Sequence, residues 1–204
     1  MWDRTDEILS GLHHWTAFRD TIGTEVHSYL HAPSGTVLDP MVPPEGLDAF
    51  GDQEIRRVVL TNRHHYRHAD AYRERFGASV HCHEAGLHEF APDQEVRGFA
   101  FGDQLAPGIT ALEVGVLTPE ETAIHIDGGG GALAFADAVI RGRSGAFGFF
   151  EDSLLGDDPE AVRAGLRDAF ARLAREHEFA ALLLAHGEPV REGARERLAT
   201  FAAG

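Results

Sequence analysis

Three histidines lie within five residues, in the segment LTNRHHYRHAD at 60–70. They are His64, His65 and His68, and imidazole nitrogens both bind divalent metals and transfer protons near neutral pH. The segment follows RVVL at 57–60, which predicts a buried strand, and precedes a predicted helix at 69–76. Loops at the carboxyl ends of parallel strands commonly carry the sites of α/β proteins. The alternative is a solvated turn whose arginines and histidines face water.

Two further polar residues follow apolar segments in the same way. Asp137 comes after the predicted strand 132–136, and His186 comes after the predicted strand at 180–184. We therefore expect both side chains at the carboxyl ends of strands. A lone histidine of this kind more often has a structural role, but three strand ends that carry His or Asp indicate a site.

The composition excludes several classes of chemistry. All 18 basic residues are arginine, so lysine-dependent Schiff-base, pyridoxal phosphate, P-loop and kinase chemistry are absent. The net charge of −15 repels a phosphate backbone, which argues against a nucleic-acid partner. Cys82 is the single cysteine, so the chain forms no internal disulfide and no cysteine-rich metal cage. Thirteen histidines, by contrast, favour metal binding.

The chain also lacks the sequence signals of a membrane protein. The apolar run at 180–185 is too short to span a bilayer, so we expect no membrane partner. Residues 1–7 lack the basic and apolar regions of a signal peptide, which predicts a cytoplasmic protein. The absence of repeats and long linkers predicts one domain over residues 1–204.

The predicted elements form two halves, each rich in strands and each finished by helix. In the first half, we expect strands at 24–31, 36–38, 57–60 and 78–81, with helices at 47–55 and 69–76. In the second half, we expect strands at 95–101, 109–114, 122–126, 132–136 and 180–184, with helices at 157–177 and 191–201. This order predicts an α/β fold with four layers, an αββα sandwich.

In this order, the features resemble the metallo-β-lactamase superfamily over nearly the whole chain. The segments SYL at 28–30 and TVLDP at 36–40 resemble the family's opening hairpin. The histidine-rich turn resembles its T-H-x-H-x-D-H motif, and LTPEET at 117–122 lies where a G-H-T-P turn is expected. Asp137 and the HGEP at 186–189 complete the order. The resemblance implies an αββα fold and hydrolysis by metal-activated water.

The metal-binding motif is incomplete in this chain. When the motif is aligned on the Leu-Thr strand end, His64 matches its second histidine, and other residue types stand at four family ligand positions. These four are Asn62, Tyr66, Arg67 and Leu117. A register shifted by one residue would instead match His65 and His68. We prefer the first register because it keeps the Leu-Thr strand end and places the small Ala69 at the start of the helix.

The resemblance therefore implies a reduced site with at most one metal ion. Its expected ligands are His64, Asp137 and His186, and the ion would be zinc, iron or manganese. Further roles follow from position: Tyr66 or His68 as the catalytic group that polarises the substrate, and Asn62 and Arg67 as substrate-binding residues. The expected partner is a small ester, thioester or phosphoester.

The rival hypothesis is a non-catalytic domain that binds or senses a small anion and has lost its metal. In that case Arg67 points into the pocket and pairs with Asp137. Convergence of His64, Asp137 and His186 within bonding reach of one point would instead favour the hydrolase.

Overall fold

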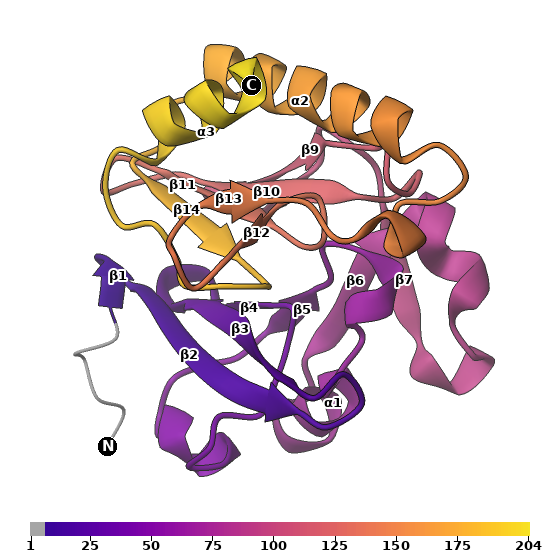
Figure 1. Ribbon diagram of the computed structural model, residues 1–204. Coiled ribbons are helices and arrows are strands. Elements are labelled where there is room, and N and C mark those ends of the chain that lie inside the picture. Colours follow the sequence, from indigo (N-terminus) through magenta and orange to yellow (C-terminus); the bar gives the residue numbers. More distant parts are fainter. Residues whose placement is uncertain (1–6) are drawn as a thin grey trace.

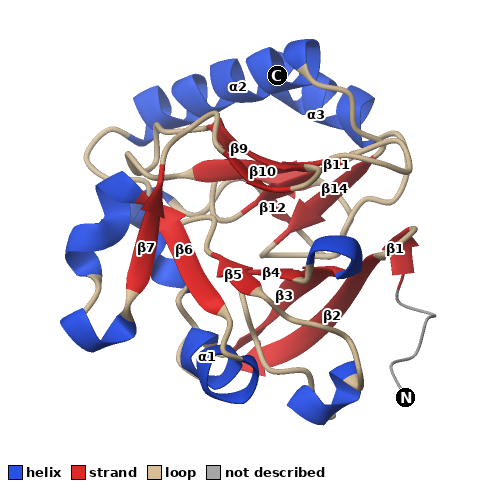
Figure 2. Cartoon of the chain, turned by 180° about the vertical axis from the view of Figure 1, so that it is seen from behind, coloured by secondary structure: helices blue, strands red, loops and turns tan. Residues whose placement is uncertain are grey.

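Two β-sheets lie face to face between outer helices in the computed structural model, which describes residues 7–204 (Figure 1). One sheet has seven strands in the order β1–β7, and the other has five in the order β14-β11-β10-β9-β8. The helix α1 (Ala69–Phe76) covers the outer face of the first sheet, and α2 (Pro159–Glu176) and α3 (Ala194–Ala203) cover the second (Figure 2). This arrangement confirms the predicted αββα sandwich.

The first sheet combines an antiparallel and a parallel part. Strands β1 to β4 pair antiparallel, whereas β4 to β7 are parallel neighbours. The strands are β1 (Glu7–Leu9), β2 (Leu12–Arg19), β3 (Thr24–His31), β4 (Thr36–Leu38), β5 (Arg57–Val59), β6 (Ser79–His83) and β7 (Val96–Phe99). The helix α1 connects β5 to the parallel β6, as the sequence predicts. It ends at Gly77, whose φ of 67° is the left-handed conformation that glycine tolerates.

The second sheet is antiparallel except at one edge, where β11 and β14 run parallel. Its strands are β8 (Gln104–Ala106), β9 (Ile109–Glu113), β10 (Thr122–Ile126), β11 (Ala132–Phe135) and β14 (Ala181–Leu184). A separate small hairpin pairs β12 (Ile140–Arg141) with β13 (Phe147–Gly148). Short 3-10 helices are η2 (Ala32–Ser34), η3 (Leu47–Phe50), η4 (Arg63–His65), η5 (Glu84–Glu89), η6 (Pro92–Gln94) and η7 (Asp152–Leu154).

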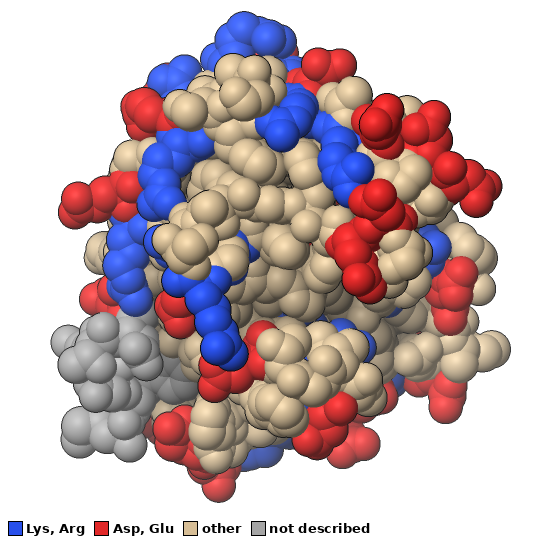
Figure 3. All heavy atoms as spheres, in the orientation of Figure 1, with Lys and Arg blue, Asp and Glu red and all other residues tan. Residues whose placement is uncertain are grey.

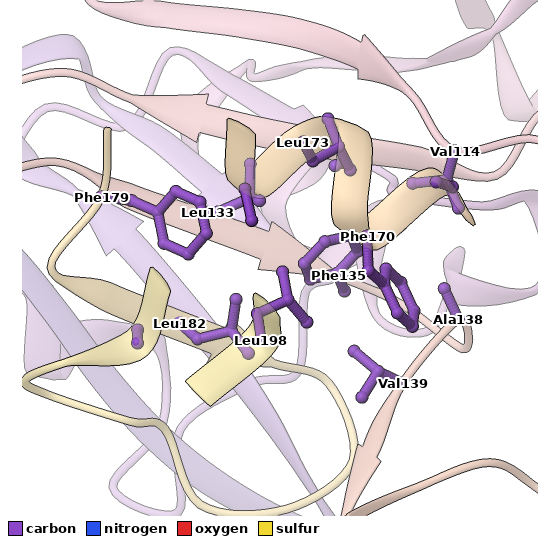
Figure 4. Close-up of a cluster of buried hydrophobic side chains, with 14 of the residues drawn as sticks. Val114, Leu133, Phe135, Ala138, Val139, Phe170, Leu173, Phe179, Leu182 and Leu198 are labelled. Atoms are coloured by element: carbon purple, nitrogen blue, oxygen red, sulfur yellow. The ribbon is translucent and has the colours of Figure 1, made fainter. Parts of the chain in front are cut away.

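A large apolar core joins α2 and α3 to the second sheet (Figure 4). Phe170 of α2 packs edge-on against Phe135 of β11, with ring centroids 5.5 Å apart. The apolar spacing along α2 predicts this face, and its Leu166, Phe170 and Leu173 are fully buried. On the surface, charged side chains of both signs surround a central uncharged area on the face in Figure 3. No helix in the described part of the chain is both long and apolar enough to cross a bilayer.

The fold differs from the predicted elements mainly near its amino end. Strands β1 and β2 precede the first predicted strand, and the helix expected at 47–55 is only η3, which Gly51 ends with a φ of 56°. Strand β2 reads LHHWTAFR, and its histidines hide the alternation that predicts a strand. The segment 1–7 considered for a signal peptide lies, except for Glu7, outside the described residues.

His81 on β6 predicts a loss of stability in acid. Burial, with the charges of Arg57 and Arg97, lowers its pKa to about 4, so the ring is neutral in the fold and protonates first in the unfolded chain. Stability therefore falls as the pH drops below about 6.5, and the decline from this residue ends near pH 4. Urea unfolding at pH 7 and pH 5 will show a smaller difference for His81→Gln than for the wild type. The exposed His88, as His88→Gln, is the control, and equal pH dependence in all three proteins would contradict the expectation.

Candidate functional site

Three strand ends bring three side chains to one point between the sheets. His65 lies at the end of η4, which follows β5, while Asp137 follows β11 and His186 follows β14. Strands β11 and β14 are parallel neighbours, so their carboxyl ends share one edge of the second sheet. The sequence predicts this convergence for Asp137 and His186.

The three side chains form a compact donor cluster. Asp137 Oδ1 lies 3.3 Å from His65 Nε2 and 3.0 Å from His186 Nε2. One ligand atom from each residue lies within 4.8 Å of the other two. Because metal–ligand bonds to His and Asp are about 2.0–2.2 Å long, these atoms fit around one divalent ion. Although burial opposes ionisation, His65 and His186 lower the pKa of Asp137 well below its usual range, so the carboxylate is charged.

A second carboxylate supports the ring of His65 from behind. Asp39 Oδ2 lies 3.2 Å from His65 Nδ1, while its two oxygens accept from the backbone N–H and the hydroxyl of Thr61 at 2.9 and 2.6 Å. Burial opposes its charge, but His65 and Arg67 lower the pKa of Asp39. A carboxylate on the far nitrogen of a histidine is the usual means of orienting a metal-binding imidazole. The arrangement therefore suits His65 as a ligand through Nε2.

Asn62 and Glu121 hold Asp137 in place. Asn62 Nδ2 donates to Asp137 Oδ2 at 2.7 Å and to Glu121 Oε2 at 3.1 Å. Glu121 Oε1 accepts from the backbone N–H groups of Asp137 and Ala138, both at 2.9 Å. Burial, together with the negative charge of Asp137, raises the pKa of Glu121. This buried network fixes the position of the Asp137 carboxylate.

The structure places His65, rather than His64, in the cluster. Asn62 begins η4 and its Oδ1 accepts from the backbone N–H of His64 at 2.9 Å. The resulting tight turn buries His65 against Asp39 and leaves His64 exposed at the cavity. The preferred register is therefore wrong at this position, and the shifted register identifies the inward histidine. The shifted register fails for His68, whose Nδ1 instead accepts from the backbone N–H of Val42 at 2.9 Å.

The other predicted roles in this turn also need correction. Tyr66 donates its hydroxyl to Asp70 at 2.5 Å and packs on Phe90, with centroids 5.8 Å apart. Neither Tyr66 nor His68 lines the cavity that contains the donor cluster, so their positions do not support the prediction that one of them polarises a substrate.

Arg67 lies behind the cluster rather than in the cavity. Its guanidinium donates to the backbone carbonyls of His27 at 3.1 Å and Asp39 at 2.9 Å. Its second terminal nitrogen lies 3.4 Å from His65 Nε2. In the described part of the chain, no ion pair joins Arg67 to Asp137. The predicted Arg67–Asp137 pair is therefore absent from residues 7–204, and Arg67 is not among the residues that line the cavity.

A cavity of about 580 Å³ opens above the donor cluster. Asn62, His65, Asp137 and His186 form its polar floor. Its walls are mainly apolar and include Ile22, Leu117, Phe150, Leu154 and Leu155. Arg19 and Thr118 add polar groups, and the buried Thr118 hydroxyl has no hydrogen-bond partner within the described part of the chain. The cavity can therefore hold a small molecule with an apolar portion over the donor cluster.

The sequence reasoning missed Asp39 and Glu121, which support the cluster. Asp39 is only 3% exposed and Glu121 is fully buried. The sequence does contain a signal for both residues. Each borders an apolar or β-branched strand, where an unpaired buried charge is costly. Such a carboxylate needs partners, and here the partners belong to the site.

Gly187 forms the turn that follows His186, and its substitution will disturb the site. Gly187 has a φ of 108°, and a Cβ there would lie 2.2 Å from the backbone oxygen of Arg141. A backbone conformation that is strained for a residue with a Cβ costs about 1–3 kcal/mol. Because the added Cβ also meets the Arg141 oxygen, we expect Gly187→Ala to lower the free energy of unfolding by more than this amount. Gly193→Ala is the matched control because Gly193 has a φ of 62° and open space around its Cβ position. Urea unfolding of both variants tests this, and an equal loss would contradict it.

No protein-family model matches the chain, and no curated protein matches it either. Solved structures do match. A beta-lactamase domain protein from Burkholderia ambifaria matches with 17% sequence identity and a TM-score of 0.65, and the match covers 97% of this chain and 74% of that one. TTHA1623, solved in a di-iron-bound form, matches with 21% sequence identity and a TM-score of 0.66, and the match covers 92% of this chain and 99% of that one. A metallo-beta-lactamase from Cronobacter sakazakii with a mutated HARLDQ motif matches with 16% identity and a TM-score of 0.65, over 96% and 91%. These likenesses show a common fold.

Proposed function

We propose that this chain, which has the fold of the metallo-β-lactamase superfamily, is a hydrolase with one divalent-ion site formed by His65, Asp137 and His186. The observation that carries the proposal is the convergence of these three donors on the floor of the 580 Å³ cavity. Three protein ligands with one open side are typical of a catalytic site and not of a structural one. The di-iron form of TTHA1623 supports metal binding in this fold.

The charges around the cluster also favour a cation. Asp39 and Asp137 carry two negative charges, whereas Arg67 contributes one positive charge beside His65. With both imidazoles neutral, as metal ligands are, the surplus is negative. It is partly cancelled by Arg67, so we expect a weaker site than one without the arginine. Burial and Arg67 oppose a charge on His65, but Asp137 and Asp39 raise its pKa, so a bound ion must displace a proton from that ring.

Each residue has a defined task in such a hydrolase. A divalent ion bound there supplies a Lewis acid that lowers the pKa of water towards about 7. Asp39 holds the ring of His65 so that Nε2 faces the cavity, and Asn62 keeps the Asp137 carboxylate in position. The apolar walls exclude water from the rest of the substrate.

The cavity narrows the expected substrate. Its apolar walls suit the acyl or aryl part of a small ester or thioester, and Arg19 at the cavity could bind an anionic group such as a carboxylate or a phosphoester. We propose small esters and thioesters with an apolar acyl group, ahead of phosphoesters.

Two neighbouring histidines provide the test of the proposal. Tag-free protein is dialysed against zinc, iron or manganese, and its metal content is measured by plasma mass spectrometry. We expect His65→Ala to lose one equivalent of metal relative to the wild type, together with hydrolysis of a p-nitrophenyl ester. His64→Ala, a change at the adjacent exposed histidine, should keep its metal. Equal metal content in the wild type and His65→Ala would refute the assignment.

The second candidate is a non-catalytic domain that binds a small anion. It is favoured by the guanidinium of Arg67 beside His65 and by Arg19 at the cavity. A wild type that binds no metal after dialysis, but is stabilised against heat by small carboxylates or phosphate, would support this candidate over the hydrolase.

A further inference from the structure

A second group of metal-binding side chains lies next to the loop that carries His186. It consists of His14 on β2, His27 on β3 and Glu188, and one ligand atom from each lies within 4.8 Å of the others. We infer that these three residues bind a divalent cation of the zinc type at a site separate from the His65–Asp137–His186 cluster. This inference does not depend on the proposed function.

The two imidazoles are held rigidly at nearly the right separation. His14 Nε2 and His27 Nδ1 share a hydrogen bond of 2.8 Å, and the rings stack with centroids 5.0 Å apart. The exposed fractions of His14 and His27 are only 6% and 4%. The ring of Tyr29 also stacks on His14, with ring centroids 5.2 Å apart. A tetrahedral ion with bonds of about 2.05 Å separates two ligand atoms by about 3.4 Å, so the nitrogens need to part by only about 0.6 Å.

Burial favours the uncharged form of both rings. Burial, with the charge of Arg191, lowers the pKa of His14 to about 4. Burial, with nearby histidines and Arg67, lowers the pKa of His27 to about 3. Both imidazoles are therefore neutral at pH 7, and a bound ion would take the place of the proton in the hydrogen bond between them, which a change of tautomer moves to the other nitrogen of one ring.

Glu188 adds the charge and the access that the histidine pair lacks. Its side chain is exposed, so an ion can enter from solvent and keep water as its remaining ligand. Two histidines and one carboxylate are a donor set that zinc accepts. The nearby Arg191 donates to the backbone oxygen of Glu7 at 3.0 Å, so its guanidinium already has a partner. An ion here would tie the β2–β3 hairpin to the loop after β14 and so restrain His186.

Zinc binding by variants that lack the first site tests the inference. Tag-free Asp137→Asn is the background, and Glu188→Gln, His14→Gln or Glu192→Gln is added to it. Glu192 is exposed four residues further on, so Glu192→Gln removes the same charge from the same region. Zinc content is measured by plasma mass spectrometry, zinc affinity by titration calorimetry, and folding by circular dichroism.

We expect the Asp137→Asn protein to keep about one equivalent of zinc. Adding Glu188→Gln should lower the zinc affinity at least about tenfold, while adding Glu192→Gln should leave it unchanged. If the His14→Gln protein does not fold, the comparison of zinc affinity between the Glu188→Gln and Glu192→Gln proteins still tests the inference, because both changed side chains are exposed. A folded Asp137→Asn protein that binds no zinc, or equal affinity in the Glu188→Gln and Glu192→Gln proteins, would overturn the inference. If wild type and Asp137→Asn both hold one ion that Glu188→Gln removes, the proposed function fails and this inference stands.

Discussion

Asp137→Asn will remove divalent-metal binding from the His65–Asp137–His186 cluster and abolish metal-dependent hydrolysis. Asp137 is the residue that contacts both histidines, at 3.3 and 3.0 Å, and it supplies the negative charge among the three donors. Changes outside the metal's own ligands already cost about 10–100-fold in affinity. We therefore expect a loss of at least about 100-fold, which corresponds to about 3 kcal/mol of binding free energy.

Titration calorimetry with zinc and manganese measures this loss directly. Asp157→Asn is the matched control, because Asp157 is exposed before α2 and carries the same charge. Glu188→Gln is included in both proteins, so that the His14–His27–Glu188 group contributes no signal. An Asp137→Asn protein that binds metal as tightly as the Asp157→Asn protein would rule out Asp137 as a ligand.

The sequence predicts the layers of the fold well because hydrophobic periodicity and strong end signals mark most elements. Helix α1 has the predicted bounds, since Gly77 is a good C-terminal cap, and α2 (Pro159–Glu176) lies within the predicted 157–177. Strands with mixed composition are harder to predict, as β2 shows with two histidines among its apolar residues. In this strand the histidines are structural partners and candidate ligands, so their polarity says little about exposure.

For the site, sequence predicts which segments converge but not which side chain of a turn faces inward. Asp137 and His186 each follow a strand, and the strand fixes their position. The direction of His65 instead depends on the hydrogen bond from the His64 N–H to Asn62 Oδ1 and on the contact with Asp39, 26 residues away in sequence. Neither interaction can be derived from a motif spacing. A shift of one residue in the motif alignment therefore exchanges the buried candidate ligand, His65, for its exposed neighbour, His64.

We expect Arg67 to limit the metal affinity of the proposed site, so that Arg67→Met binds divalent ions more tightly than the wild type. Its guanidinium lies 3.4 Å from His65 Nε2, so an ion on that nitrogen would lie within about 5 Å of a positive charge. With an effective dielectric constant of 20, this repulsion is about 7 kcal/mol before Asp39 and Asp137 screen it. Even a fifth of this energy raises affinity about tenfold. The same change removes two hydrogen bonds to backbone carbonyls, so the variant should be less stable by about 2–3 kcal/mol.

These opposite effects distinguish electrostatic repulsion from general damage to the site. Affinity is measured by calorimetry and stability by urea unfolding, with Arg67→Lys as the variant that keeps the charge and Arg19→Met as the variant that removes a charge elsewhere in the cavity. Arg67→Gln serves if Arg67→Met is too unstable, because its amide can still donate to a carbonyl. Tighter binding in a less stable protein is the signature of a cation placed beside a ligand. Unchanged or weaker binding in the folded Met and Gln variants would show that the guanidinium does not oppose the ion, and that its bonds to His27 and Asp39 instead keep His65 in place.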